Sequence, residues 1–292
     1  MSFVEPRSLI ERAFSEKWAL GAFNTSNLEM TQAIAWGLEQ QNSPGIIQTS
    51  EGAIEYAGLQ IIYDIVRDVS ENANVPIFLH LDHGKSFEIV EKCILAGYKS
   101  VMIDGSKMSF ADNVALTKKV VDFAHANGVW VEGEIGSIQG KEGMLKADIK
   151  MDDSMLTDPD EAIEFVIQTS VDSLAVSVGT IHGAFRGEEK IRFERLAAIK
   201  ERVKIPLVLH GASGLPQDEI TRAVREGIVK VNIDTELREA FHNTVMENEE
   251  RMENNSVDPR KMLAPGRDAV QKLVAQKALV LGSAGKKVDP GV

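Results

Sequence analysis

The amino-acid sequence predicts a single-domain (β/α)8 TIM barrel, and three observations support this fold. Eight short apolar runs recur along the 292 residues, most of them are followed by an amphipathic stretch, and every run ends in a polar residue. Repeated strand-then-helix units build parallel sheets, and eight of them close into a barrel. A doubly wound sheet is the alternative, but it would place its site at one switch point and leave the eight polar strand ends unexplained.

The predicted strands and helices follow one another in chain order. The strands are expected at 19–24, 45–50, 76–82, 100–105, 129–135, 173–179, 206–211 and 228–234. Between them, Asn27 to Gln41 and Phe110 to Asn127 repeat apolar residues at helical spacing. Gly97, Gly128 and Gly227 stand where helices would end, because glycine adopts the left-handed conformation of a helix C-terminus.

Two longer segments lie outside this repeating pattern. The stretch 137–158 after the fifth strand has glycines at both ends of its first part, and it is either a mobile lid or an ordinary solvated loop. The charged stretch 247–259 is interpreted as a helix end and a surface excursion. The barrel domain is predicted to occupy residues 1–281, and residues 282–292 form a small, polar and flexible C-terminal tail.

The composition limits the class of partner and the compartment. A formal net charge of −12 argues against nucleic acid and anionic membranes, which require an electropositive face. The single cysteine, Cys93, allows no internal disulfide and is interpreted as a core residue. The first twelve residues do not resemble a signal peptide, and no run approaches the length of a membrane span. We therefore expect a cytoplasmic protein.

The polar residues that end the strands define the candidate site. They are Asn24, Ser50, Asp82 with His83, Asp104 with Ser106, Glu134, His182, His210, and Asn232 with Asp234. In this fold the C-terminal ends of the strands carry the chemistry. A single histidine after an apolar run is more often a hydrogen-bonded structural residue than a ligand. Histidines at three strand exits, with carboxylates nearby, instead favour a metal site with an open position.

Small residues after the last three strands indicate a second feature of the site. Gly183 follows strand six, residues 211–214 follow strand seven, and residues 232–235 lie at the end of strand eight. Barrels commonly bind phosphate in this region through backbone N–H groups and small hydroxyls. Glycines after strands are usually only turns, so either loop alone is weak evidence. A metal beside a phosphate site suggests a small phosphorylated carbonyl compound.

Seven motifs, in order, resemble the class II, metal-dependent ketose-bisphosphate aldolases over nearly the whole chain. They are Gly21-Ala22-Phe23-Asn24, Leu81-Asp82-His83-Gly84, Met102-Ile103-Asp104-Gly105-Ser106, Glu132-Gly133-Glu134-Ile135-Gly136, Gly179-Thr180-Ile181-His182-Gly183, Leu209-His210-Gly211-Ala212-Ser213-Gly214 and Asn232-Ile233-Asp234-Thr235. Within the family, the chain is most similar to the shorter branch that contains both fructose- and tagatose-bisphosphate aldolases.

The resemblance implies catalytic Zn²⁺ on His83, His182 and His210. It also implies Glu134 as an accessory or alternative ligand and Asp104 as a nearby outer or second-metal carboxylate. Dihydroxyacetone phosphate would chelate the metal, which acts as a Lewis acid.

The resemblance assigns proton transfer to two carboxylates. Asp82 would exchange a proton with the aldehyde oxygen, and Glu142 of the 137–158 loop would move the proton at the dihydroxyacetone carbon.

The resemblance also places the substrate. The implied binding residues are Asn24, Ser50, Gly183, Gly211, Ala212, Ser213, Asn232, Ile233, Asp234, Thr235, Arg238 and Arg260, with a monovalent cation (Na⁺ or K⁺) near the phosphate. Arg238 would bind the distal phosphate, and Asp258-Pro259-Arg260 resembles the element that a neighbouring subunit adds in a homodimer or homotetramer. Asp234 favours fructose 1,6-bisphosphate, because tagatose-specific relatives usually carry alanine there.

Two other functions remain compatible with parts of the pattern. A Schiff-base aldolase needs an inward lysine, and Lys230 has the right parity, although a structural ion pair with Glu132 is the simpler interpretation. A non-catalytic sugar-phosphate-binding protein would explain the histidines and glycines but gives Asp82 and Glu142 no role.

Overall fold

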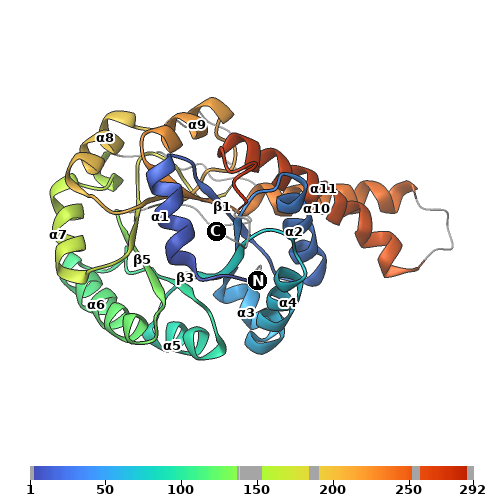
Figure 1. Ribbon diagram of the computed structural model, residues 1–292, viewed down its shortest axis with the longest axis horizontal. Helices are drawn as coiled ribbons and strands as arrows, with labels where there is room; N and C mark the ends of the chain where they lie inside the picture. Colours follow the sequence, from blue (N-terminus) through green and yellow to red (C-terminus); the bar gives the residue numbers. More distant parts are fainter. Residues whose placement is uncertain (1–2, 137, 139–152, 184–190, 252–256, 288–292) are drawn as a thin grey trace.

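The computed structural model describes residues 3–136, 138, 153–183, 191–251 and 257–287, and these form a closed barrel of parallel strands (Figure 1). The strands are β1 (Leu20–Asn24), β2 (Gly45–Ser50), β3 (Ile77–Gly84), β4 (Ser100–Ile103), β5 (Trp130–Ile135), β6 (Ser173–Val176), β7 (Leu207–Leu209) and β8 (Ile228–Ile233). Each strand pairs with its neighbours in sequence, and β8 pairs with β1. The predicted (β/α)8 barrel is confirmed.

Most of the helices surround the barrel on its outside, while α1 crosses one end of it (Figure 1). They are α1 (Pro6–Glu16), α2 (Leu28–Gln40), α3 (Glu51–Ala57), α4 (Leu59–Glu71), α5 (Phe87–Ala96), α6 (Phe110–Ala126), α7 (Pro159–Thr169), α8 (Phe193–Arg202), α9 (Gln217–Arg225), α10 (Thr235–Arg251) and α11 (Pro259–Val280), with a short 3-10 turn at Asp153–Met155. The paired helices α10 and α11 extend beyond the barrel as an arm. Among the described residues, no helix is both long and apolar enough to span a membrane.

The helix ends follow local sequence signals. Asn27 precedes α2 and its side chain accepts a hydrogen bond from the Met30 N–H, which satisfies one of the free donors at the helix start. Gly97 ends α5 with a φ of 114°, a left-handed conformation that glycine adopts at little cost. These two helix boundaries agree with the sequence prediction.

Residues along each strand alternate between the outer core and the barrel interior, as β3 shows. Ile77, Leu79 and Leu81 belong to the apolar core between strands and helices. Phe78 lies in the apolar cluster at the N-terminal end of the interior, a cluster that also contains Trp130 and the α1 residue Ile10. The interior side of β3 therefore runs from an apolar floor, closed by α1, to a polar mouth at Asp82. Whether the domain ends at residue 281, with a flexible tail after it, stays a prediction.

Candidate metal centre

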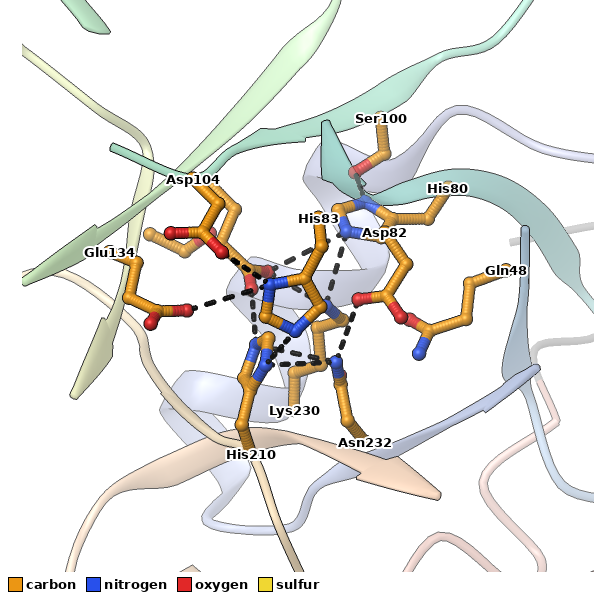
Figure 2. Close-up of polar contacts among 12 residues, drawn as sticks. Gln48, His80, Asp82, His83, Ser100, Asp104, Glu134, His210, Lys230 and Asn232 are labelled. Carbon is orange, nitrogen blue, oxygen red and sulfur yellow. Dashed lines mark hydrogen bonds and ion pairs between the residues drawn. The ribbon is translucent and has the colours of Figure 1, made fainter. Parts of the chain in front are cut away.

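Asp82 is the last inward residue of β3, and two amides hold its carboxylate. Asn24 Nδ2 at the end of β1 donates to Asp82 Oδ2 over 2.9 Å, and Asn232 Nδ2 of β8 donates to Asp82 Oδ1 over 3.0 Å. Gln48 Nε2 in turn donates to Asn24 Oδ1 over 2.6 Å. Two strands thus hold the two oxygens of a fully buried carboxylate, and a third strand supports one of the two amides. Figure 2 shows the bond from Asn232.

The charges around Asp82 keep this carboxylate ionised. Burial alone would raise its pKa, but the adjacent His83, His210 and Lys230 lower the pKa to about 2. A buried, ionised and oriented carboxylate is suited to accept a proton from a bound hydroxyl.

Three imidazoles converge beside Asp82. His83 follows it with a φ of 48°, an uncommon conformation for a residue other than glycine. The ring centroid of His83 lies 4.9 Å from that of His182 and 4.8 Å from that of His210. One nitrogen from each ring lies within 4.8 Å of the others. Burial lowers the pKa of His182 and of His210, which favours the neutral imidazoles that metal ligation requires.

In two of the imidazoles, a carboxylate determines which ring nitrogen carries the proton and which is left unprotonated to face the other imidazole. His83 Nδ1 lies 2.9 Å from Asp104 Oδ2, and His210 Nε2 lies 3.0 Å from Glu132 Oε1. Ionised carboxylates only accept hydrogen bonds, so these nitrogens carry the protons. The other nitrogens, His83 Nε2 and His210 Nδ1, are then acceptors, and they lie 3.0 Å apart. Two converging lone pairs at this separation favour a cation between or beside them.

Glu134 adds a further potential ligand. Its Oε2 is buried without a hydrogen-bond partner among the described residues and lies 3.9 Å from His83 Nδ1. Burial, reinforced by the charge of Asp104, raises the pKa of Glu134 to about 8. Glu134, Asp104 and His83 form a second group whose ligand atoms lie within 4.8 Å of one another. Neutral imidazoles held by outer carboxylates, beside an unpaired carboxylate oxygen, fit a divalent cation such as Zn²⁺.

The loops after β6 and β7 pack closely against each other. Thr180 Oγ1 donates to the carbonyl oxygen of His210 over 2.7 Å. A Cβ on Gly211, whose φ is 64°, would lie 2.3 Å from the carbonyl oxygen of Ile181, so only glycine fits there. Gly183 also has a positive φ, of 102°. The two loops that contain Gly183, Gly211, Ala212 and Ser213 are therefore neighbours, as a phosphate site built from both requires.

Asp234 and Asn232 present buried acceptors at the end of β8. Asp234 Oδ1 accepts from Arg238 Nε over 2.6 Å, while Asp234 Oδ2 and Asn232 Oδ1 have no hydrogen-bond partner among the described residues. Burial raises the pKa of Asp234, although Arg238 opposes the shift. A ligand hydroxyl or amide would satisfy these oxygens.

Three other predicted binding residues lie at the mouth in supporting positions. Ser50 pairs in register with Asp82, and its hydroxyl accepts from the Ala53 N–H at the start of α3. The Ile233 side chain is buried in the outer core, so only its backbone can face a ligand. Thr235 is the buried first residue of α10.

One predicted residue is not brought to this site, and another lies outside the described residues. The side chain of Arg260 is 89% exposed and pairs with Asp258 at the start of α11, the length of α10 away from Thr235. Glu142, with most of the 137–158 loop, lies outside the described residues. Their predicted roles stay predictions.

Sequence reasoning did not identify Gln48 or Ser100 as members of the buried network. Gln48 supports Asn24, and Ser100 Oγ lies 2.7 Å from His80 Nδ1. The available signal was strand alternation. Gln48 is two residues before Ser50, so the two side chains share one face, and Gln48 is a polar residue in an apolar strand. The predicted ion pair of Lys230 with Glu132 is confirmed, with Lys230 Nζ 2.8 Å from Glu132 Oε2.

Comparisons with known proteins agree with this geometry. A family model described as "Fructose-bisphosphate aldolase class-II" matches residues 4–286. The chain is 42% identical to a fructose-bisphosphate aldolase of Geobacillus stearothermophilus, covering 98% of this chain and 99% of the relative. It is 41% identical to a fructose-bisphosphate aldolase of Helicobacter pylori, covering 97% and 99%. The solved structure of the YdjI aldolase from Escherichia coli K12 is similar at a TM-score of 0.84 and 32% identity, covering 98% of this chain and 100% of that one.

Proposed function

The chain belongs to the class II fructose-bisphosphate aldolase family, and from this premise we propose that it reversibly cleaves fructose 1,6-bisphosphate to dihydroxyacetone phosphate and glyceraldehyde 3-phosphate. We assign Zn²⁺ to His83, His182 and His210, with Glu134 as an accessory or alternative ligand. The observation that carries this assignment is the 3.0 Å approach of His83 Nε2 and His210 Nδ1, both made acceptors by their outer carboxylates. When bound, the cation would act as a Lewis acid on the substrate's carbonyl oxygen.

The chain's own residues would move the protons. In the cleavage direction, Asp82 accepts the proton of the hydroxyl whose oxygen becomes the aldehyde, and in condensation it returns that proton. Its ionised state and its bonds from Asn24 and Asn232, which orient the carboxylate, support its role as proton acceptor. Glu142 is proposed for the proton at the dihydroxyacetone carbon, a role that rests on the resemblance.

The phosphate groups would lie at the other side of the mouth. Backbone N–H groups of Gly183 and of the 211–213 loop, with Ser213 and Thr235, are proposed to bind the first phosphate beside a Na⁺ or K⁺ ion. Arg238 is proposed for the distal phosphate. The exposed Arg260 on the arm is proposed to complete the same site of a neighbouring subunit in a homodimer or homotetramer. A cytoplasmic location stays a prediction.

Substrate choice is assigned to Asp234. Fructose and tagatose bisphosphates differ in the configuration of one hydroxyl-bearing carbon, so discrimination needs a group that hydrogen-bonds one epimer only. The unpaired, buried Oδ2 of Asp234 is such a group. A site built around a hydroxyl rejects a substrate that cannot pair with it, because the buried polar group is left unsatisfied.

The test is cleavage of both sugar bisphosphates by metal-replete and chelator-treated protein. We expect fructose 1,6-bisphosphate to be preferred, chelation to abolish cleavage, and added Zn²⁺ or Co²⁺ to restore it. Borohydride with substrate should trap no adduct. Full activity in chelator, or a covalent adduct on Lys230, would refute the metal-dependent reaction. A preference for tagatose would refute the substrate assignment alone.

A further inference from the structure

A buried line of polar groups leads to His210 from below, and apart from His210 the proposed chemistry does not use its members. It consists of Ser100, His80, Lys230, Glu132 and His210, each within hydrogen-bonding distance of the next. Figure 2 labels all of them except Glu132. Glu132 is 1% exposed and Lys230 is 5% exposed. Burying such charges is costly unless they are paired and hydrogen-bonded, so a buried lysine–glutamate pair beside the metal centre indicates a specific role.

The donors and acceptors in this line have only one consistent assignment. Lys230 can only donate, so His80 Nε2, 3.2 Å from Lys230 Nζ, accepts. His80 Nδ1 therefore carries the proton and donates to Ser100 Oγ over 2.7 Å. Lys230 also donates to Glu132 Oε2 over 2.8 Å. The lysine thus bridges a neutral imidazole on one side and a carboxylate on the other.

The second oxygen of Glu132 connects this line to the metal centre. Glu132 Oε1 lies 3.0 Å from His210 Nε2 and accepts a hydrogen bond from its N–H, which leaves Nδ1 as the unprotonated nitrogen that faces His83. The orientation of the His210 ring therefore depends on the place of Glu132. The place of Glu132 depends on Lys230, because Lys230 is the cation that holds its other oxygen within the barrel interior.

Building on the proposed metal-binding role of His210, we propose that Lys230 and Glu132 are positioning residues for that ligand. Together they hold His210 in the tautomer and ring orientation that present Nδ1 to a divalent cation. This gives the inward lysine a function that is neither Schiff-base formation nor general stabilisation of the core.

The two residues act through different physical effects. Replacing Lys230 with methionine keeps the apolar stem but leaves the Glu132 carboxylate buried without its cation, so the carboxylate is free to turn away from His210. Replacing Glu132 with glutamine keeps the shape but introduces an NH₂ group. Lys230 repels this NH₂ and draws the amide oxygen toward itself, so the NH₂ faces His210 Nε2 and drives the proton onto Nδ1, the nitrogen meant for the metal. Lost outer contacts of this kind typically weaken metal binding by about 10- to 100-fold.

The experiment measures metal binding rather than activity. Co²⁺ affinity by chelator competition, and the visible absorption spectrum of the Co²⁺ protein, would be compared among wild type, Lys230→Met and Glu132→Gln. Lys277→Met is the matched control, because it removes another buried lysine whose Nζ lies 2.7 Å from a glutamate, here Glu236. The spectrum reports ligand geometry, which a purely structural role would not change.

We expect both Lys230→Met and Glu132→Gln to bind Co²⁺ about 10- to 100-fold more weakly with an altered spectrum, and Lys277→Met to match wild type in both. If Lys230→Met does not fold, the nearly isosteric Glu132→Gln carries the test alone. Wild-type affinity and spectrum in the folded variants would overturn the inference while leaving the proposed function intact. A wild-type chain that binds no divalent cation would instead overturn the proposed function, on which this inference rests.

Discussion

The floor and the mouth of the barrel are built from the same strands and are equally buried, yet they differ in what their side chains satisfy. At the floor, Phe78 and Trp130 pack with apolar residues of α1. At the mouth, Glu134, Asn232 and Asp234 each keep a buried oxygen without a hydrogen-bond partner among the described residues. Each unsatisfied buried group costs about 1–3 kcal/mol. The floor therefore stabilises the fold, and the mouth retains groups that only a ligand would satisfy.

The layer between the floor and the mouth differs from both, because its polar side chains are buried and paired with one another. His80, Lys230 and Glu132 are polar and buried, but their side-chain groups pair with one another and with the residues above. Polar burial alone thus does not mark a binding site. The informative feature is a cluster of buried polar atoms that the protein itself leaves unpaired. Among the described residues, three of the five such atoms belong to Glu134, Asn232 and Asp234 at the mouth, while Gln48 Oε1 lies within β2 and Ser70 Oγ lies in α4.

The largest expected effect comes from Asp82 at the mouth. Asp82→Asn keeps the shape but removes the base, so turnover should fall by about 10²-fold or more, the usual scale of general acid–base catalysis. Metal content, measured by elemental analysis, should remain near one per chain. Loss of metal in this variant would instead show that Asp82 is a metal ligand, and the fall in turnover could then not be ascribed to proton transfer alone.

Phe78 at the floor should show the reverse behaviour. Phe78→Ala should lower the free energy of unfolding by about 3–5 kcal/mol through lost burial and a residual cavity. Denaturant titration measures this change, and Phe78→Leu is the conservative control. Turnover of the folded fraction should match wild type, because Phe78 is two layers below Asp82. A turnover defect in stable Phe78→Leu protein would show that the floor also affects catalysis, and would contradict the division of roles between floor and mouth.

The smallest expected effect concerns Asp234. Asp234→Ala should cost about 10- to 100-fold in fructose 1,6-bisphosphate cleavage, equivalent to losing one buried hydrogen bond, while retaining or gaining activity on the tagatose epimer. Stability should change little, because the variant removes an unpaired buried oxygen together with one ion pair to the half-exposed Arg238. Steady-state kinetics on both sugars test this. Equal losses on the two would return Asp234 to a supporting role beside Arg238.

Much of the fold was predictable because its signals are local. The eight apolar runs match the strands to within a few residues, and Asn27 and Gly97 mark helix ends through their own side-chain and backbone properties. The strand-end histidines were also predictable, since a closed parallel barrel brings all strand ends to one face.

The remaining site could not be derived from local patterns, because it depends on contacts across the barrel. The bridge from His80 through Lys230 to Glu132 joins β3, β8 and β5, whose registers are fixed only when the barrel closes. The Lys230 and Glu132 pair, and the inward direction of Gln48, were accessible from strand alternation, but the partners of Gln48 and Ser100 were not, because those partners lie on neighbouring strands. The left-handed backbone of His83 was likewise not evident from sequence.

The most direct test of the metal assignment is anomalous X-ray scattering from crystals of the zinc-loaded protein, measured on both sides of the zinc absorption edge. We expect one strong peak at about 2.0–2.1 Å from a nitrogen of each of His83, His182 and His210, with His83 Nε2 and His210 Nδ1 as the bonded atoms. No peak among the three imidazoles, or bonds through His83 Nδ1 or His210 Nε2, would contradict the metal assignment.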